Sequence, residues 1–416
     1  MKQLLIYIGS EPKFSEEHET LTKIQIDNSL EWWKPEDILL VTDFSYEYKG
    51  VKSYVVSGNF KALDGNRSSK IPVINQLFRD GIINDLFWFH DHDAFQLGPM
   101  RDPELGDYVA GFTTEGWSDR WNAGSFFFTS GAEKIFKWIE RSMLQRNTNE
   151  QDALTHLWSK GLEGYKILNN TYNVGIYHTE EVLKKVDTPL IVAHFHPRKP
   201  KHMEIFKDLI PEKLRRIFEI NEKIADLKSL VFDAKGRYRE WAPYFNKYHC
   251  DVVCEIGIRQ GFHFDYLIKS NPKQAVAVDC WIDDGVIGRN DSCFNQAGLD
   301  RQYEKFKNLM ADKPFVKICK GYSFDVVKEF SDEYFDYIFI DGDHTYPGIS
   351  RDLVDWYPKM KKGGVFCGHD YNIRNVRAKN GVKIEFGVIK AVDEFVAKNN
   401  ITTFFTLTPN TWGIIK

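Results

Sequence analysis

The sequence has no apolar run that approaches the roughly 18 residues needed to cross a bilayer. Its first residues, MKQLLIYIGSEPKF, hold only a short apolar run that charged residues soon follow, which is not the pattern of a signal peptide. The formal net charge is only −4, so the excess of positive charge that would indicate nucleic acid is missing too. We therefore expect a soluble cytoplasmic protein without a membrane span and without nucleic acid as a partner.

The first half of the chain has no cysteine, and the six cysteines of the second half lack the two spaced pairs of a structural zinc site. Internal repeats and low-complexity segments are also missing. What remains is ordinary globular material, with 27% charged, 43% hydrophobic and 15% aromatic residues. A chain of 416 residues can form two or three domains, each with its own core.

Two α/β blocks follow one another along the chain. In residues 1–202, the apolar runs QLLIYIG, DILLVTD, LFWFHD and NAGSFFFTS are bounded by turn signals and predict buried strands. Residues 203–235 carry apolar side chains at helical spacing and predict a helical linker. Residues 236–416 then form the second predicted domain.

The second block alternates regularly between strands and helices. The runs DVVCEI, QAVAVD, PFVKIC, FDYIFID and GGVFCGHD are each followed by a helical pattern, which specifies a parallel sheet with crossovers. The last two runs, TTFFTL and TWGIIK, are separated only by TPN, so we expect a hairpin that adds one antiparallel strand.

A glycine loop follows the first strand of this block, in VVCEIGIRQGFHFDYLI. Gly257 and Gly261 permit a tight turn and let backbone N–H groups approach a ligand at a helix N-terminus, with Glu255 just before them. A purely structural turn would use the same glycines, and the spacing E-x-G-x-x-x-G is not that of dinucleotide binders. The next strand ends in Asp279, where an acid that grips ribose hydroxyls is expected.

Together these features resemble the class I S-adenosylmethionine-dependent methyltransferases, over about residues 238–416. The resemblance implies a seven-stranded sheet with one reversed strand. It also implies that Glu255 neighbours the methionine amino group of the cofactor, that Asp279 binds the ribose, and that Ser323 in KGYSFD lies near the adenine.

Polar residues end two more strands of the same block. The predicted strand FDYIFI is followed by Asp341, Asp343 and His344, and the next predicted strand ends in His369 and Asp370. Because the carboxyl ends of parallel strands meet at one crevice, a divalent cation held by Asp341 and Asp370 could bind a diol and lower the pKa of a hydroxyl. His344 could then take the proton.

The stretch FIDGDHTYPGISRDLVDWYPKMKKGGVFCGHDY resembles the metal-dependent sugar O-methyltransferases within this superfamily. Two other interpretations stay open. Asp343 and His344 could only cap the helix that follows, or His344 could act as a base without any metal.

Asp91-His92-Asp93 directly follows the strand LFWF in the first block. Two carboxylates at this spacing can bind one Mg²⁺ or Mn²⁺, which would bridge a diphosphate. A bare D-x-D is common by chance. By strand alternation, His90 and His92 are expected to point elsewhere and only to support the site.

The motifs that follow in the chain, RWNAGSFFF, NEQDAL, YKILNNTYN and VAHFHPRKP, resemble those of GT-A-type glycosyltransferases of the glycogenin-like group, over about residues 2–202. The resemblance implies that Tyr7, Gly9 and Asp43 contact the nucleotide. It implies that Asn122 and Gly124 face the donor sugar or the acceptor, although Asn122 could also be a turn residue.

Three further roles depend on the same resemblance. Asp152 would bind sugar hydroxyls or act as a base, unless it is a plain N-cap. HFHPRKP is one residue shorter than the family's segment and has Pro197 where glycine is usual. This leaves open whether His194 or His196 is the third metal ligand and whether Lys199 reaches the diphosphate.

The sequence thus predicts two Rossmann-like α/β domains: a metal-dependent glycosyltransferase that uses a nucleotide-sugar, fused to a sugar O-methyltransferase. The arrangement resembles multidomain proteins of large algal viruses, which would act in a host cytoplasm. A methyltransferase with a non-catalytic substrate-binding first domain is the main alternative. An adaptor built from two degenerate domains is a third interpretation.

Overall fold

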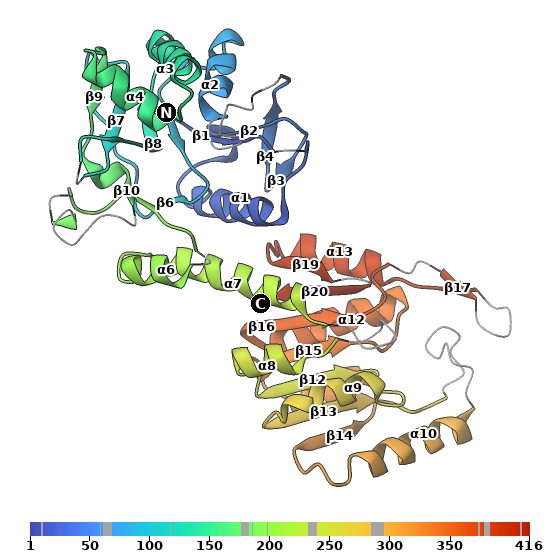
Figure 1. The fold of residues 1–416 in the computed structure, drawn as a ribbon. Coiled ribbons are helices and arrows are strands. Elements are labelled where there is room, and N and C mark those ends of the chain that lie inside the picture. Colours follow the sequence, from blue (N-terminus) through green and yellow to red (C-terminus); the bar gives the residue numbers. More distant parts are fainter. Residues whose placement is uncertain are drawn as a thin grey trace. The chain divides into compact units, whose positions relative to one another are not determined.

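In the computed structural model, the chain forms two compact units, Met1–Asn221 and Glu222–Lys416 (Figure 1). The structure describes residues 1–9, 11–58, 60, 69–116, 118–175, 183–184, 186–197, 199–231, 239–283, 295–372, 375–377, 383–407 and 410–416. No helix in this part of the chain has the length and apolar character of a membrane span. No disulfide joins the cysteines within it.

The first unit is built on an eight-stranded sheet with the order β3-β4-β2-β1-β5-β8-β7-β9. Strands β1, β2, β4 and β5 run parallel, and β8 pairs antiparallel with both β5 and β7. All four predicted strands of this block are present. The strands are β1 (Lys2–Tyr7), β2 (Ile38–Thr42), β3 (Glu47–Tyr48), β4 (Val51–Val55), β5 (Phe87–His90), β7 (Ala110–Thr114), β8 (Trp121–Phe128) and β9 (Tyr165–Ile167).

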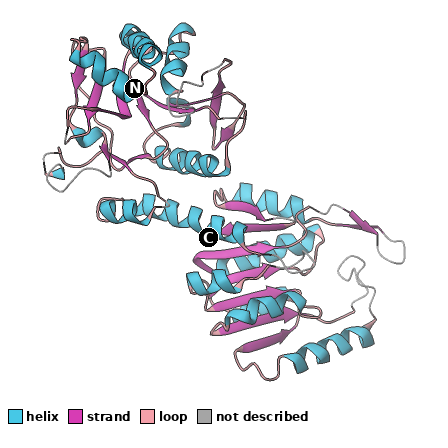
Figure 2. Ribbon diagram, viewed as in Figure 1, coloured by secondary structure: helices cyan, strands magenta, loops and turns pink. Residues whose placement is uncertain are grey.

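Helices cover both faces of this sheet (Figure 2). On one face, Leu4 and Ile6 of β1 pack with side chains of α2 (Lys70–Arg79), α3 (Glu133–Arg146) and α4 (Glu150–Ser159). On the other face, Leu5 packs with Ile26 of α1 (Glu16–Ser29). Successive residues of β1 are therefore buried on opposite sides, which explains its unbroken apolar run.

A small second sheet extends this unit, with the order β10-β11-β6. Its strands are β10 (Val174–Gly175), β11 (Val192–His194) and β6 (Ala94–Gln96). Phe95 of β6 packs in a cluster with Phe206, Leu214 and Phe218. Part of the predicted linker therefore belongs to the core of the first unit.

Residues 203–235 were expected to be one helical segment, but two helices occur there, α6 (Pro200–Phe206) and α7 (Glu212–Ser229). The division between the compact units, between Asn221 and Glu222, falls inside α7. From Glu222 onward α7 belongs to the second unit. There, Arg239 donates hydrogen bonds to the carbonyls of Leu227 in α7 and of Leu230 just after it. The end of the predicted linker, residues 232–235, lies outside the described residues.

The second unit contains a seven-stranded sheet with the order β14-β13-β12-β15-β16-β20-β19. Strand β20 runs antiparallel to both its neighbours, and β12 to β16 are parallel. The predicted terminal hairpin and its reversed strand are confirmed. The strands are β12 (Val252–Ile256), β13 (Gln274–Asp279), β14 (Val316–Lys320), β15 (Phe335–Ile340), β16 (Met360–Gly368), β19 (Phe404–Leu407) and β20 (Thr411–Ile415), and a separate ribbon pairs β17 (Asn375–Arg377) with β18 (Lys383–Glu385).

Helices also cover both faces of this sheet. One core includes Leu353 of α12 (Tyr346–Trp356) and Val392 of α13 (Val388–Lys398). On the opposite face, Phe245 of α8 (Ala242–Tyr248) packs on the ring of Tyr337 at 4.8 Å. The remaining helices are α9 (Phe262–Leu267), α10 (Gln296–Leu309) and the short α11 (Ser323–Val326). The predicted fold class, two Rossmann-like α/β domains, is confirmed.

Candidate functional site

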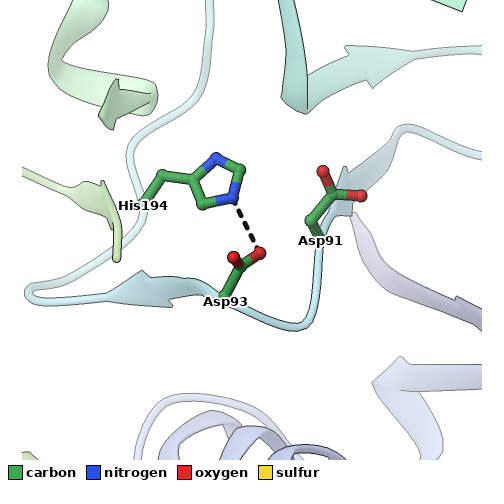
Figure 3. A group of neighbouring side chains, drawn as sticks. All are labelled: Asp91, Asp93 and His194. Carbon is green, nitrogen blue, oxygen red and sulfur yellow. Dashed lines mark hydrogen bonds and ion pairs between the residues drawn. The ribbon is translucent and has the colours of Figure 1, made fainter. Parts of the chain in front are cut away.

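A tight turn at the end of β5 carries the two carboxylates of the D-x-D motif. The backbone N–H of Asp91 donates to the carbonyl of Gly124 at 2.8 Å, and Ala94 closes the turn by donating to the carbonyl of Asp91. Strand β6 then pairs antiparallel with β11, which places His194 opposite Ala94. As a result, Nε2 of His194 lies 2.7 Å from Oδ1 of Asp93 (Figure 3).

Asp91, Asp93 and His194 form a candidate metal site. Each offers one ligand atom, and these atoms lie within 4.8 Å of one another. Two carboxylate oxygens and an imidazole nitrogen are suitable ligands for Mn²⁺ or Mg²⁺. Gly124 makes room for this arrangement, since a Cβ there would lie 2.5 Å from Nδ1 of His194.

The second candidate histidine lies outside this cluster. Nε2 of His196 is 3.1 Å from a carboxylate oxygen of Glu17, and its backbone N–H donates to Nδ1 of His202. Lys199 begins α6 as its N-cap residue, at an exposed position. Of the two histidines that the sequence left open, His194 is the one that joins the carboxylates.

A buried lysine that the sequence analysis did not identify contacts the D-x-D motif. Nζ of Lys70 lies 2.8 Å from Oδ1 of Asp91 and 3.2 Å from Oε1 of Glu150, and it donates to the carbonyl of Ala123. Burial alone would lower the pKa of Lys70, but the two carboxylates raise it above its ordinary value. Lys70 is therefore a permanent positive charge beside the candidate metal site.

The two carboxylates of the motif differ electrostatically. Burial raises the pKa of Asp91, and the nearby Lys70 offsets this only in part. Burial would also raise the pKa of Asp93, but His194 outweighs it and holds the pKa of Asp93 below its usual range. His90 is fully buried, and burial lowers its pKa to about 3. Burial also lowers the pKa of His92, to about 4.

The predicted nucleotide contacts lie at the ends of β1 and β2. The ring of Tyr7 is 4.6 Å from that of Phe14 and 6.3 Å from that of His92. The buried Oδ1 of Asp43 has no hydrogen-bond partner among the residues that the structure describes. A Cβ at Gly9 would lie 2.7 Å from the carbonyl oxygen of Glu11, so the backbone is tightly folded there.

Asp152 lies in the first turn of α4, but it is not the N-cap. Asn149 is the N-cap residue, and its side chain accepts a hydrogen bond from the backbone of Asp152 at 2.9 Å. The carboxylate of Asp152 accepts two hydrogen bonds from Arg120, at 3.1 and 2.9 Å, and further ones from Thr148 and Asn149. The side chain of Asn122 accepts from the backbone of Gly124.

The second unit contains a cavity of about 940 Å³ at the carboxyl ends of its parallel strands. Its lining includes the residues predicted for the cofactor and for the reaction, with the exception of Gly261: Glu255, Gly257, Asp279, Ser323, Asp341, His344, His369 and Asp370. Gly261 is instead the N-cap of α9, where a Cβ would lie 2.5 Å from the ring of Phe306.

The glycine loop brings two strand ends together. Gly257 has a φ of +91°, and a Cβ there would lie 2.1 Å from the carbonyl oxygen of Asp341. Oδ2 of Asp279 accepts from the backbone of Arg259 at 2.7 Å, and Oδ1 accepts from that of Trp281 at 2.9 Å. These bonds fix the Asp279 carboxylate at the cavity wall.

Two other cavity residues are buried acids. Burial, with further contributions from Asp341 and Asp279, raises the pKa of Glu255 well above its ordinary value. Ser323 donates a hydrogen bond of 2.5 Å to Oδ1 of Asp352, a residue of α12 that the sequence analysis did not identify. Burial raises the pKa of Asp352 to about 7.

Asp341, His369 and Asp370 form a second candidate metal site, with ligand atoms within 4.8 Å of one another. His369 adds an imidazole to the two carboxylates that the sequence predicted. Nε2 of His344 lies 3.1 Å from both Oδ1 of Asp341 and Oδ2 of Asp370. The His344 ring stacks on Phe386 at 4.8 Å and 12°.

The alternative that Asp343 and His344 only cap α12 is therefore wrong for His344. Thr345 is the N-cap residue, since its hydroxyl accepts from the backbone of Gly348. Asp343 supports this cap by accepting from the backbone and hydroxyl of Thr345, at 2.9 and 2.7 Å. His344 instead faces the carboxylates of the candidate metal site.

A sequence profile of a methyltransferase domain family matches residues 254–371, which run from β12 through the glycine loop to the residue after Asp370. The second unit therefore contains a methyltransferase domain. No curated protein matches the chain.

Solved structures of methyltransferases and of glycosyltransferases resemble parts of the chain. The O-methyltransferase NovP is 16% identical with a TM-score of 0.31, over 41% of this chain and 74% of its own. A glycosyltransferase involved in the glycosylation of the major capsid of PBCV-1 is 12% identical with a TM-score of 0.33, over 52% and 99%. The galactosyltransferase LgtC, in complex with donor and acceptor sugar analogs, is 14% identical with a TM-score of 0.35, over 52% and 100%. These values bear on neither substrate nor mechanism.

Proposed function

We propose that the second unit methylates a hydroxyl group of a saccharide with S-adenosylmethionine. One observation carries this proposal: the predicted cofactor residues and a cluster of carboxylates and imidazoles line the same cavity. A cofactor held by Glu255 and Asp279 would therefore lie beside the groups that can activate an acceptor. The methyltransferase family match over residues 254–371 supports the same reaction class.

The chemistry of the acceptor explains the second cluster. A sugar hydroxyl has a pKa far above 7, so its transfer reaction needs a base, a cation or both. When bound, S-adenosylmethionine supplies an electrophilic methyl group, and a divalent cation supplies a Lewis acid for the acceptor oxygen. Asp341, His369 and Asp370 would hold that cation.

We assign the role of the base to His344. Its Nε2 lies 3.1 Å from a carboxylate oxygen of Asp341 and 3.1 Å from one of Asp370. Nε2 of His344 would accept the proton of the acceptor hydroxyl, and Asp341 and Asp370 would be among the residues that hold the cation. The cofactor would supply the methyl group to the acceptor oxygen, with its carbon–sulfur bond breaking, and His344 would keep the hydroxyl proton.

For the first unit, we propose metal-dependent transfer of a sugar from a nucleotide-sugar to a saccharide acceptor. Asp91, Asp93 and His194 would hold Mn²⁺ or Mg²⁺, which would neutralise the diphosphate of the leaving group. The unsatisfied Oδ1 of Asp43 supports a nucleotide site at the neighbouring strand end, because a ligand donor would satisfy it. Lys70 would keep Asp91 ionised and oriented.

Two measurements on the full-length protein test these proposals. We expect S-adenosylmethionine to be consumed with a saccharide panel as acceptor, and EDTA to abolish this turnover. We also expect hydrolysis of at least one nucleotide-sugar with Mn²⁺ and none with EDTA. Methyl transfer without any nucleotide-sugar binding would favour a methyltransferase whose first domain only binds substrate. Absence of both activities and of cofactor binding would refute the proposed function.

A further inference from the structure

A chain of three buried side chains leads from the start of α8 to the cavity of the second unit. Nε1 of Trp241 donates to Nε2 of His263 at 2.8 Å. Nδ1 of His263 lies 3.2 Å from Oε2 of Glu255, which is close enough for an ion pair but lacks the alignment of a hydrogen bond. Trp241, His263 and Glu255 are 1%, 4% and 2% exposed. We refer to these three residues as the Trp–His–Glu chain.

The first contact determines which nitrogen of His263 carries the proton. An indole N–H can only donate, so Nε2 of His263 must be the acceptor. Burial lowers the pKa of His263 to about 3, which keeps the imidazole neutral. A neutral imidazole that accepts at Nε2 has its proton on Nδ1. That proton lies on the side of the ring that approaches Glu255.

Packing fixes the plane of the imidazole. The His263 ring centroid lies 3.9 Å from that of Phe339 of β15, and the ring of Trp241 lies 4.9 Å from that of Tyr337 on the same strand. His263 is the second residue of α9, so its backbone is held by the glycine loop. Neither ring can turn without losing contacts in a close-packed interior.

We propose that Trp241 and His263 are positioning residues for the cofactor. Trp241 selects the His263 tautomer whose Nδ1 proton lies on the side of Oε2 of Glu255, and this proton would orient the carboxylate towards the ammonium group of bound S-adenosylmethionine. This inference rests on the proposed function of the second unit, and it assigns roles to two residues that do not themselves bind the ammonium group.

Two substitutions of His263 separate the two ends of its ring. The amide of asparagine takes the place of Nδ1 and can still donate to Glu255, whereas the amide of glutamine takes the place of Nε2 and reaches only Trp241. The probes are S-adenosylhomocysteine and 5′-methylthioadenosine, which share the adenosine and thioether but differ in the amino-acid group. Their dissociation constants are measured by calorimetry with the full chain.

We expect H263N to bind S-adenosylhomocysteine within about threefold of the native protein. H263Q should bind it at least about tenfold more weakly, the usual size of a lost hydrogen bond to a charged group. W241F should also weaken the binding of S-adenosylhomocysteine. Without the indole N–H, Nε2 of His263 no longer has to accept a hydrogen bond, so the proton is no longer confined to Nδ1. All three variants should bind 5′-methylthioadenosine like the native protein, which also shows that the cavity is folded.

Equal affinities of H263N and H263Q for S-adenosylhomocysteine would overturn the positioning role. Equal losses for both ligands in H263Q and W241F would do the same, since they would indicate a general packing defect. If H263N fails to fold, the ligand selectivity of W241F still decides the question. If the native protein binds neither ligand, the proposed function fails, which differs from a failure of the Trp–His–Glu chain alone.

Discussion

Replacing Gly257 by alanine should damage the second unit far more than an alanine at another glycine of similar conformation. Gly257 has a φ of +91°, and a Cβ there would lie 2.1 Å from the carbonyl oxygen and 2.4 Å from the carbonyl carbon of Asp341. Gly363, in the same unit, has a φ of +75°. A Cβ there would meet only Nζ of Lys223, the flexible end of a side chain, at 3.3 Å.

Both substitutions carry the conformational cost of a Cβ at positive φ, but only G257A also forces a Cβ against backbone atoms. A residue with a Cβ at positive φ costs about 1–2 kcal/mol, which applies to both. At Gly257 the backbone of Asp341, which directly follows β15, must also move by more than 1 Å to reach a contact distance of about 3.5 Å. That shift would break the bond of 2.7 Å between the N–H of Asp341 and the carbonyl of Ile256. We expect a total of at least about 3 kcal/mol for G257A, and about 1–2 kcal/mol for G363A.

Scanning calorimetry measures the difference. In a unit of this size, 1 kcal/mol shifts the midpoint by about 2–4 °C, so G257A should lower it by about 6–12 °C or more. G363A should lower it by no more than about 8 °C. The transition of the second unit is identified by its rise with S-adenosylhomocysteine, and G257A should also weaken that ligand at least about tenfold. Equal midpoints and equal affinities for the two variants would refute the argument from backbone contact.

Four further outcomes are expected. Asp93→Ala should abolish Mn²⁺-dependent binding of a nucleoside diphosphate and leave the affinity for S-adenosylmethionine unchanged; loss of both would mean that the sites are coupled. His344→Ala should reduce methyl transfer by about 10²-fold or more while cofactor binding survives, and normal turnover would remove the base from the mechanism. The pKa of Asp352 is raised to about 7 in the folded protein, so its stabilising effect is complete below the unfolded pKa and is lost as the pH rises towards 7. Between pH 5 and 7 the native protein should therefore lose up to about 1.4 kcal/mol per pH unit relative to D352N, and parallel curves in urea denaturation would contradict this. A fragment of residues 212–416 should fold and bind S-adenosylhomocysteine with a higher midpoint than a fragment of residues 236–416, which lacks α7; equal midpoints would show that α7 does not stabilise the second unit.

The alternation of strands and helices was enough to predict the seven strands of the second sheet, because each is marked by its own apolar run. In the first unit it predicted only β1, β2, β5 and β8; the other four strands of the main sheet and the small sheet β10-β11-β6 were not predicted. The reversed strand of the second unit could also be predicted, since TPN is too short for anything but a hairpin between β19 and β20. The break between α6 and α7 was not predicted. Apolar residues keep their helical spacing across residues 207–211, and the signal for the interruption is Pro211, which directly precedes α7.

The buried Lys70 could not be predicted for a different reason. Its partners, Asp91 and Glu150, come from separate elements far along the chain, and each of the three residues alone is an ordinary surface type. A lysine becomes buried only when the fold supplies enough opposite charge, and that balance depends on tertiary structure. Trp241 and His263 were missed similarly, since neither forms a motif with Glu255 in the sequence.

The choice between His194 and His196 shows why residue type and spacing could not determine the metal ligands. In a continuing strand, residues 194 and 196 would lie on the same face, so both could approach the carboxylates. Strand β11 ends at His194, which pairs with Ala94 of β6. One more backbone hydrogen bond follows, from the N–H of Phe195 to the carbonyl of Asp93. Beyond this bond the chain turns, and His196 reaches Glu17 instead. The end of a three-residue strand therefore determines the third candidate ligand, and a strand's end is the feature that a single sequence predicts least well.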